Sequence, residues 1–208
     1  MEVADFTVDK EKNIKADWST DTEKGTNTVG TSLISVTLRN ISDNPVRLTQ
    51  TQFKFDHISG QECVLGGGDG RIAGRYDIKV PDSAKSPISV TRKMGWDLPP
   101  HKQETISYTV GPEHSAAGSL AWIYRFTIFI TSDKGEIELP TVAHAASSDL
   151  VDVTIGNAEL VFSPDSEYRS RQPCFKDEAK IVDDIIDSTK HTSPELRKLN
   201  KGLAAFVP

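Results

Sequence analysis

The chain has 208 residues, with 24 Lys and Arg against 30 Asp and Glu, and its formal net charge is -6 at pH 7. This acidic balance, without a basic stripe, argues against binding to nucleic acid. Hydrophobic residues make up 37% and charged residues 26% of the chain, which fits a polar globular protein rather than a disordered one.

The N-terminus, Met1 to Asp5, is polar and acidic, so it does not resemble a signal peptide with a basic segment followed by an apolar one. No apolar run approaches the ~18–20 residues of a membrane-spanning helix. We therefore expect a cytoplasmic protein, or one exported without a classical signal peptide, and no association with membranes. A chain whose leader had been removed would look the same.

Period-two alternation, which is typical of half-buried strands, first appears at residues 34–38. A turn-forming segment, Asn40 to Pro45, separates it from a second alternating segment at residues 46–55. The alternation of this second segment breaks near Gln50 and Thr51, which predicts a β-bulge or a strand that changes sheets.

The strongest predicted strand is Leu120 to Thr131, where Trp122, Tyr124 and Phe126 share one face with Ile128 and Ile130. A turn at residues 132–135 leads into a short partner strand at 136–139. Further strands are predicted at 72–80, 105–110 and 150–162. Short strands with regular turns indicate a sandwich or a barrel, and no helical period is visible before residue 173.

The composition changes after Pro164, and residues 165–172 are typical of a polar linker. From Phe175 the apolar period becomes helical, and Ser193 with Pro194 predicts the start of a second helix. We thus predict a β-sandwich domain at 1–164 and a linker with a helical tail at 165–208. The tail either packs on its own sandwich or docks on a partner or a second copy through an apolar stripe formed by Phe175, Val182, Ile185 and Ile186.

The stretch Val36, Leu38, Asn40, Ser42 and Pro45 resembles the immunoglobulin-like class of β-sandwiches. The Leu-Pro-Pro segment at residues 98–100, before an alternating strand, is similar to that class as well. The resemblance implies an antiparallel immunoglobulin-like sandwich. It does not extend to the Cys-Trp-Cys core of antibody domains, and a fold of this class does not define a function.

The two cysteines, Cys63 and Cys174, are far apart in the sequence and belong to no C-x-x-C pair. Without clustered Cys or His ligands, a metal site is not expected. We expect two free thiols. The alternative is a disulfide that joins the tail to the sheet, which would indicate an oxidising compartment.

Two segments predicted to be loops are the candidate recognition surfaces. The first is Gly66 to Arg71, whose backbone N–H groups and Arg could contact a phosphate, although no helix or Gly-Lys-Ser/Thr sequence follows it. The second is Met94 to His101, which contains a tryptophan. The candidate ligand-binding residues are Gly67, Gly68, Asp69, Arg71, Trp96 and Asp97.

Signals of catalysis are absent from the sequence. The five histidines form neither H-x-H nor H-E-x-x-H, and there is no G-x-S-x-G nucleophile motif. We expect no cofactor and lean against an enzyme. The leading hypothesis is a non-catalytic binding or interaction module with a protein partner, self-association or a carbohydrate ligand, whose tail mediates assembly. The alternatives are a membrane-acting, toxin-like β protein and a hydrolase on a β-sandwich scaffold.

Overall fold

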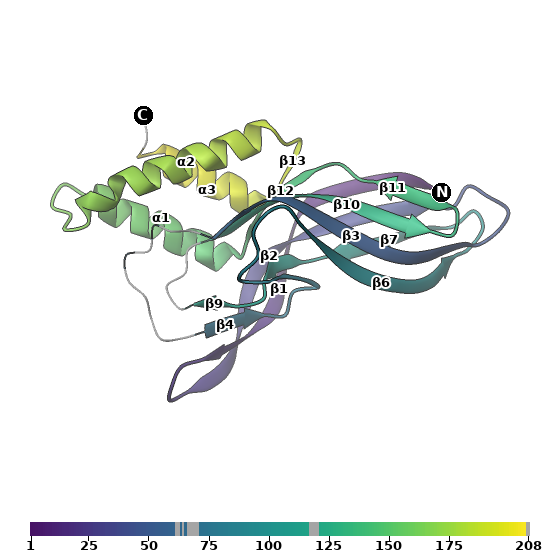
Figure 1. Ribbon diagram of the computed structural model, residues 1–208, viewed down its shortest axis with the longest axis horizontal. Coiled ribbons are helices and arrows are strands. Elements are labelled where there is room, and N and C mark those ends of the chain that lie inside the picture. The colour runs from purple at the N-terminus through teal and green to yellow at the C-terminus, as the bar shows by residue number, and fades with distance from the viewer. Residues whose placement is uncertain (61–62, 64, 66–70, 117–120, 207–208) are drawn as a thin grey trace.

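A computed structural model of the chain describes residues 1–60, 63, 65, 71–116 and 121–206, with the side chains of residues 9–11 left aside. It is a mostly-β structure in which two antiparallel sheets face each other and helices form a further layer at one side (Figure 1). The predicted sandwich-like β fold with a short C-terminal helical extension is confirmed.

The first sheet has the strand order β7-β2-β1-β4-β9. Its strands are β1 (Glu2–Ser19), β2 (Lys24–Arg39), β4 (Arg71–Gly74), β7 (Gln103–Tyr108) and β9 (Ser115–Ala116). The second sheet has the order β13-β12-β10-β3-β6, and β11 pairs with β10. Its strands are β3 (Val46–Ser59), β6 (Ile88–Leu98), β10 (Trp122–Ser132), β11 (Gly135–Glu138), β12 (Val142–Ala146) and β13 (His191–Thr192). A small parallel pair joins β5 (Ile78–Val80) to β8 (Val110–Pro112).

The sandwich core lies between the two sheets and follows the predicted alternation. On β10, Tyr124, Phe126, Ile128 and Ile130 are all buried in this core. The predicted irregularity near Gln50 is also present, because the pairing of β3 with β6 shifts register between Leu48 and Gln50. Alternation therefore placed the central strands and their inward faces correctly.

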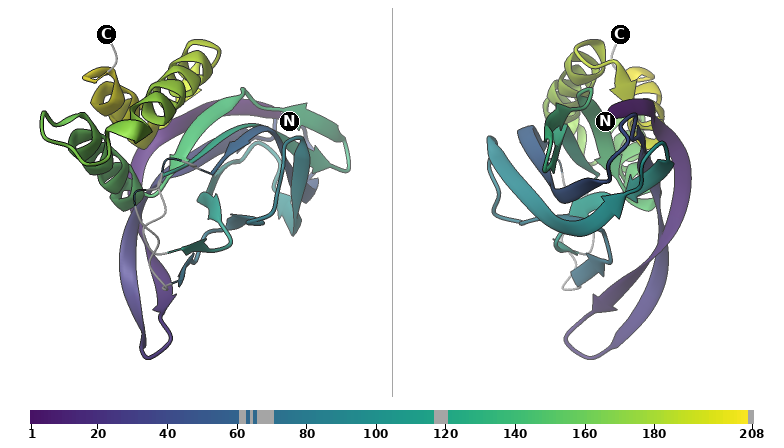
Figure 2. Two further views of the ribbon diagram at one scale, coloured as in Figure 1. Left: turned by 60° about the vertical axis from the view of Figure 1, so that its left-hand side comes forward. Right: turned by 90° about the vertical axis from the view of Figure 1, so that its right-hand side faces the viewer.

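The longest element is the β1–β2 hairpin, which sequence analysis did not predict. It pairs from Glu2 opposite Arg39 to Ser19 opposite Lys24, with register shifts between Val3 and Asp5 and between Val8 and Lys10. Its closed end projects beyond both sheets, as Figures 1 and 2 show. Near that end, β1 is flanked on its other edge by the short strand β4, which starts at Arg71.

Three α-helices, α1 (Ser148–Phe162), α2 (Gln172–Asp187) and α3 (Pro194–Ala204), are gathered at one side of the sandwich (Figure 2). They cover the outward face of the second sheet, where Ile123 of β10 and Ala143 and Ala145 of β12 join their buried side chains in a second core. The α2 stripe therefore packs inside the chain, in the core that the helices share with these strands.

The prediction of a strand at residues 150–162 was wrong, because this segment is α1. Its β-branched residues and the Gly156–Asn157 pair suggested a strand with a turn. The buried positions are Val151, Thr154, Ala158 and Val161, whose spacing of three and four residues is that of one helix face. Packing against the sheet and the other helices outweighs the local propensity.

The expectation of two free thiols was also wrong. Cys63, in the connection between β3 and β4, forms a disulfide with Cys174 near the start of α2. Their Cα atoms are 5.7 Å apart, within the range that a disulfide requires. The bond joins the connection that leads into β4 to the helical layer.

Candidate functional site

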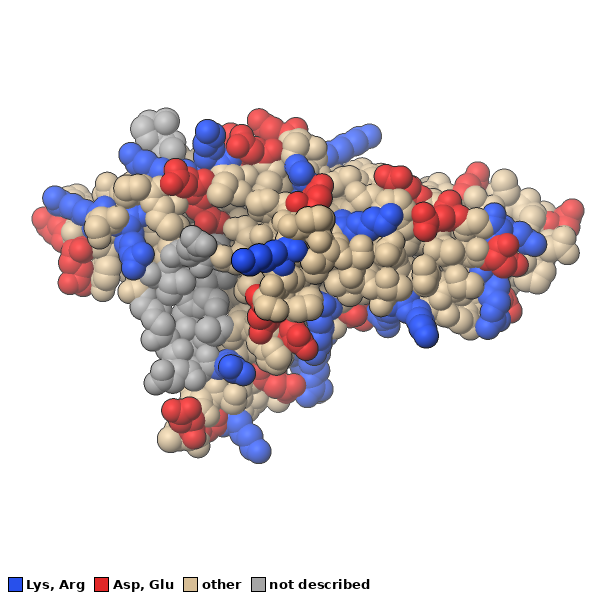
Figure 3. Space-filling model, viewed as in Figure 1, with Lys and Arg blue, Asp and Glu red and all other residues tan. Residues whose placement is uncertain are grey.

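A groove of about 630 Å³ lies at the projecting end of the β1–β2 hairpin. Three strands and one loop position contribute its polar side chains, which are Asp17, Ser19, Lys24, Thr26, Arg71 and His114. Figure 3 shows acidic and basic side chains interspersed over this face of the molecule, including the hairpin that projects at the bottom.

The strand register explains why these side chains gather. Ser19 of β1 pairs with Lys24 of β2 on one edge and with Arg71 of β4 on the other. Directly opposed residues point to the same face of a sheet, so the three side chains form one row. Two residues further along the strand, Asp17 pairs with Thr26 and Ala73 to form a second row on the same face.

Asp17 is already engaged by its neighbours. Its two carboxylate oxygens accept hydrogen bonds from Arg75 Nε at 3.1 Å and Arg75 Nη2 at 3.0 Å. Thr26 Oγ1 donates a further bond of 3.1 Å. These contacts, chiefly the one with Arg75, lower the pKa of Asp17 below its ordinary value. The negative charge of Asp17 is therefore matched within the chain.

Lys24 and Arg71 are in the opposite situation. Both are exposed, and neither forms an ion pair with any residue that the structure describes. At the rim, His114 Nδ1 is 3.2 Å from the Asp82 carboxylate, and the backbone N–H of His114 donates to the same carboxylate at 2.8 Å. Since Arg75 balances Asp17, the two unmatched cations give the groove a local positive charge.

Trp18 and Gly25 form the pair between the two polar rows, so the indole points to the face of the sheet opposite to that of Asp17 and Ser19. The indole lies against the backbone of Gly25, because a Cβ placed on that glycine would be 2.7 Å from the indole Nε1. Glycine thus permits a close approach that holds the half-buried aromatic ring against the hairpin.

Of the predicted glycine-rich loop, Gly67, Gly68 and Asp69 lie outside the described residues. Arg71 is described, and it begins β4 in the wall of the groove. One candidate residue from the sequence is therefore part of the site.

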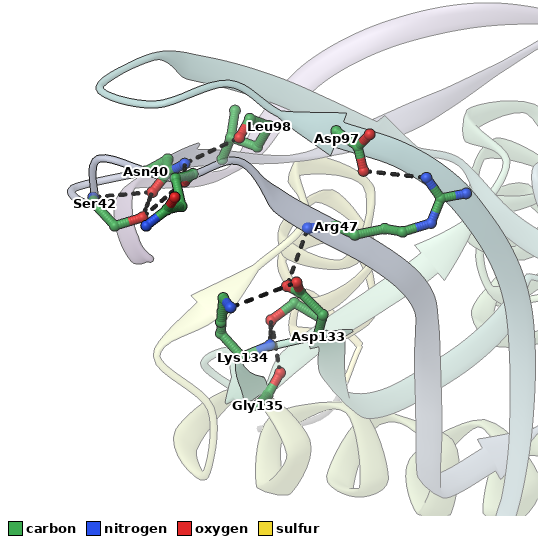
Figure 4. A network of polar contacts seen from close by, with 10 residues as sticks. Asn40, Ser42, Arg47, Asp97, Leu98, Asp133, Lys134 and Gly135 are labelled. Atoms are coloured by element: carbon green, nitrogen blue, oxygen red, sulfur yellow. Dashed lines mark hydrogen bonds and ion pairs between the residues drawn. The ribbon is translucent and has the colours of Figure 1, made fainter.

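Trp96 and Asp97 lie elsewhere, and the prediction that they belong to a loop was wrong. Both are in β6, where Trp96 is opposite Leu48 and packs partly against the sandwich core. Asp97 accepts a bond of 3.2 Å from Arg47, near a polar network around Asn40 and Asp133 (Figure 4). This end of the sandwich is where β1 begins, whereas the groove is where β1 ends.

The residues of the predicted interaction stripe pack against other parts of the same chain. Phe175, Val182 and Ile185 are buried in the core between helices and sheet, and Ile186 is half-buried against it. The stripe thus holds α2 against α3 and α1 in this core.

The histidines are dispersed through the fold. His144 of β12 is fully buried, and its Nε2 donates to the Val110 carbonyl oxygen at 2.9 Å. His101 Nε2 is 2.9 Å from Asp43. Across the described ranges, no group of three or more His, Cys, Asp or Glu side chains is arranged to hold a metal ion.

Sequence reasoning missed Asp17, Ser19, Lys24 and Thr26. A signal for them does exist, because Ile14, Ala16 and Trp18 alternate with polar residues before the turn-forming segment at 20–23. In this turn Thr20 accepts from the backbone N–H of Glu23 at 3.0 Å. The high charge of the segment obscured the hairpin.

Comparison of the chain with models of known protein families and with curated proteins gave no match. In the part of the chain that the structure describes, no helix is long and apolar enough to cross a membrane.

Proposed function

We propose that the protein is a non-catalytic binding module that recognises a negatively charged ligand in the hairpin groove. The observation that carries this proposal is the row Lys24, Ser19 and Arg71 on three neighbouring strands. Neighbouring strands lie ~4.8 Å apart, so the two cations start about 10 Å from each other on either side of a hydroxyl. Their long side chains can contact the same anionic group or two adjacent ones.

The charge of the whole chain makes this row notable. The protein carries a formal charge of -6, yet the carboxylate that lines the groove is bonded to Arg75. An anionic ligand would supply the counter-charge that Lys24 and Arg71 lack. Charge-assisted hydrogen bonds of this kind are stronger than neutral ones.

The ligand class that best fits the groove is an acidic oligosaccharide. Its carboxylates would pair with Lys24 and Arg71, and its hydroxyl groups would bond to Ser19 and Thr26. The groove of about 630 Å³ is large enough for more than one sugar unit.

Calorimetric titration with an oligo-uronate, beside a neutral oligosaccharide of the same length, tests the proposal. We expect the acidic sugar to bind at low ionic strength and the neutral one to bind more weakly. Added salt should weaken the acidic sugar's binding. Replacing both Lys24→Gln and Arg71→Gln should lower the affinity by about tenfold or more, since charge-assisted bonds are lost.

Lys102→Gln is the matched control. Lys102 is exposed near Asn40, at the end of the sandwich away from the groove, and its substitution removes one positive charge as well. Equal affinity for the acidic and neutral sugars, or an equal loss in the Lys102 control, would contradict the proposal.

The disulfide supports a further part of this proposal, which is that the protein works in an oxidising compartment. Disulfides persist outside the cytosol and are rare within it. In this account the helical layer covers the second sheet and supports the binding hairpin through the hydrogen bond between Ser32 of β2 and Glu195 of α3.

A further inference from the structure

A second pocket lies where the edges of the two sheets meet, and it is independent of the hairpin groove. Its volume is about 280 Å³. One wall is Phe6, Thr7 and Val8 of β1, and the other is formed by β13, the residue before it, and the first turn of α3. We call this the seam pocket.

Among the side chains that the structure describes, the titratable ones that line the seam pocket are all basic: Lys190, His191 and Arg197. None of the three forms a salt bridge with a carboxylate in the described ranges. Glu195, in the same turn of α3, is turned toward Ser32 of β2 and hydrogen-bonds to it. The carboxylate of Glu195 is therefore bonded to Ser32 rather than to the basic groups of the pocket.

The position of Arg197 is also electrostatically unfavourable. It lies in the first turn of α3, and the positive end of a helix dipole disfavours a cation there. Its guanidinium is nevertheless directed to the pocket side, where Nη1 donates to the backbone carbonyl of Thr192. A bound anion would relieve the repulsion between the basic groups and the helix end.

Two of the three basic groups are positioned by the fold. His191 is fixed by pairing with Val142 in the parallel β12–β13 ladder. Its ring stands edge-on to the ring of Phe6, with centroids 5.1 Å apart. Arg197 is held by its bond to Thr192. Preorganised donors lose less entropy on binding than freely rotating ones, so the pocket suits a compact ligand.

We infer that the seam pocket binds a tetrahedral oxyanion, either free phosphate or the phosphate group of a larger molecule. Arg197 supplies a planar pair of donors, Lys190 a mobile ammonium group and His191 a ring N–H. Phosphate and sulfate have the compact shape and the several acceptor oxygens that such a set of donors requires.

The direct test is a titration of the full-length protein with inorganic phosphate, followed by calorimetry and by NMR of the His191 ring. We expect saturable binding that shifts the His191 signals, and Lys190→Gln should weaken it by about tenfold. Arg197→Gln should weaken it similarly, and its melting temperature shows whether the fold is kept. Lys201→Gln, on the same helix but outside the pocket, should bind as the wild type does.

A second arm uses sulfate, whose charge stays constant near neutral pH. Burial and the charge of Lys190 lower the pKa of His191, so the ring is mainly neutral at pH 7 and gains a proton on acidification. The other charged group in the pocket wall is Arg197 of α3, and the described side chains of β1 that line the pocket, Phe6, Thr7 and Val8, are not titratable. Sulfate should bind more tightly at about pH 5.5 than at about pH 7.5, and His191→Gln should remove this difference.

Comparison of inorganic phosphate with glycerol 3-phosphate distinguishes the two sources of the oxyanion. Tighter binding of the ester favours a phosphate on a larger molecule, whereas tighter binding of the free ion favours phosphate itself. Absence of saturable binding to either, or equal weakening by Lys201→Gln, overturns the inference. Because Lys24 and Arg71 take no part, the outcome is independent of the hairpin groove.

Discussion

The hydroxyl of Ser32 in β2 donates a hydrogen bond to the carboxylate of Glu195 in α3, although the two residues are 163 positions apart. Ser32 is fully buried and Glu195 is 5% exposed. The bond therefore links the long hairpin near the start of the chain to its last helix, inside the molecule.

Glu195→Ala should destabilise the fold by about 1–3 kcal/mol, because it leaves the buried Ser32 hydroxyl without its partner. Glu195→Gln should cost less, since its amide oxygen can still accept. Urea unfolding followed by circular dichroism measures both. The exposed Glu159→Ala on α1 serves as the control and should stay within about 0.5 kcal/mol of wild type. An Ala variant as stable as that control would mean that the bond has no structural role.

Reducing the disulfide should also lower stability. Cys63 and Cys174 are 111 residues apart, and the chain-entropy relation gives about 4–5 kcal/mol as the contribution of closing such a loop. We expect the double variant Cys63→Ser and Cys174→Ser to unfold at lower urea concentration than the oxidised wild type. Wild type treated with a dithiol should behave in the same way. Identical unfolding curves with and without reductant would show that the bond is not formed.

Burial of His144 makes stability depend on pH. Burial lowers its pKa below the ordinary value of 6.5, against opposing effects of Glu195 and the bond to the Val110 carbonyl. Below that ordinary value the unfolded chain takes up a proton that the folded chain does not, so stability decreases as the pH falls from about 6.5 through the folded pKa.

We therefore expect His144→Gln to show a smaller loss of stability between about pH 7.5 and about pH 5.5 than the wild type. Urea midpoints at the two pH values provide the measurement. His57 and His191 also have lowered pKa values, so part of the dependence should remain. A variant with the full pH dependence of the wild type would exclude His144 as a contributor.

Two glycines should respond in opposite directions to alanine. A Cβ on Gly25 would lie 2.7 Å from Trp18 Nε1, so Gly25→Ala should displace the indole and cost about 1–3 kcal/mol. Gly156 lies within α1 and has open space around it, so Gly156→Ala should stabilise the helix by about 0.5–1 kcal/mol. Tryptophan fluorescence should change in the first variant and not in the second.

The central strands could be predicted from the sequence because each of their two faces packs against a different layer of the protein. On β10, the face with Tyr124 and Phe126 meets the other sheet, and Ile123 on the opposite face meets the helices. This explains a strand that is apolar on one side and mixed on the other. The start of α3 was also predictable, since Ser193 accepts from the backbone N–H of Leu196 as an N-cap.

The remaining features depend on contacts that no local pattern encodes. The strand β1 exposes many charged side chains, and its pairing with the 16 residues of β2 holds it in place. Helix α1 owes its conformation to packing on β12 and α3. The hairpin groove arises from strands that are distant in sequence, so Arg71 was the one member that the sequence pointed to.

The most direct test of the proposed function is an NMR titration of the labelled wild-type protein with an oligo-uronate. The account predicts that shift changes concentrate at residues 17–26 and 71–75 and at His114, which form the hairpin groove and its support. Shift changes confined to another surface, or no change at all under conditions of low salt, would contradict it.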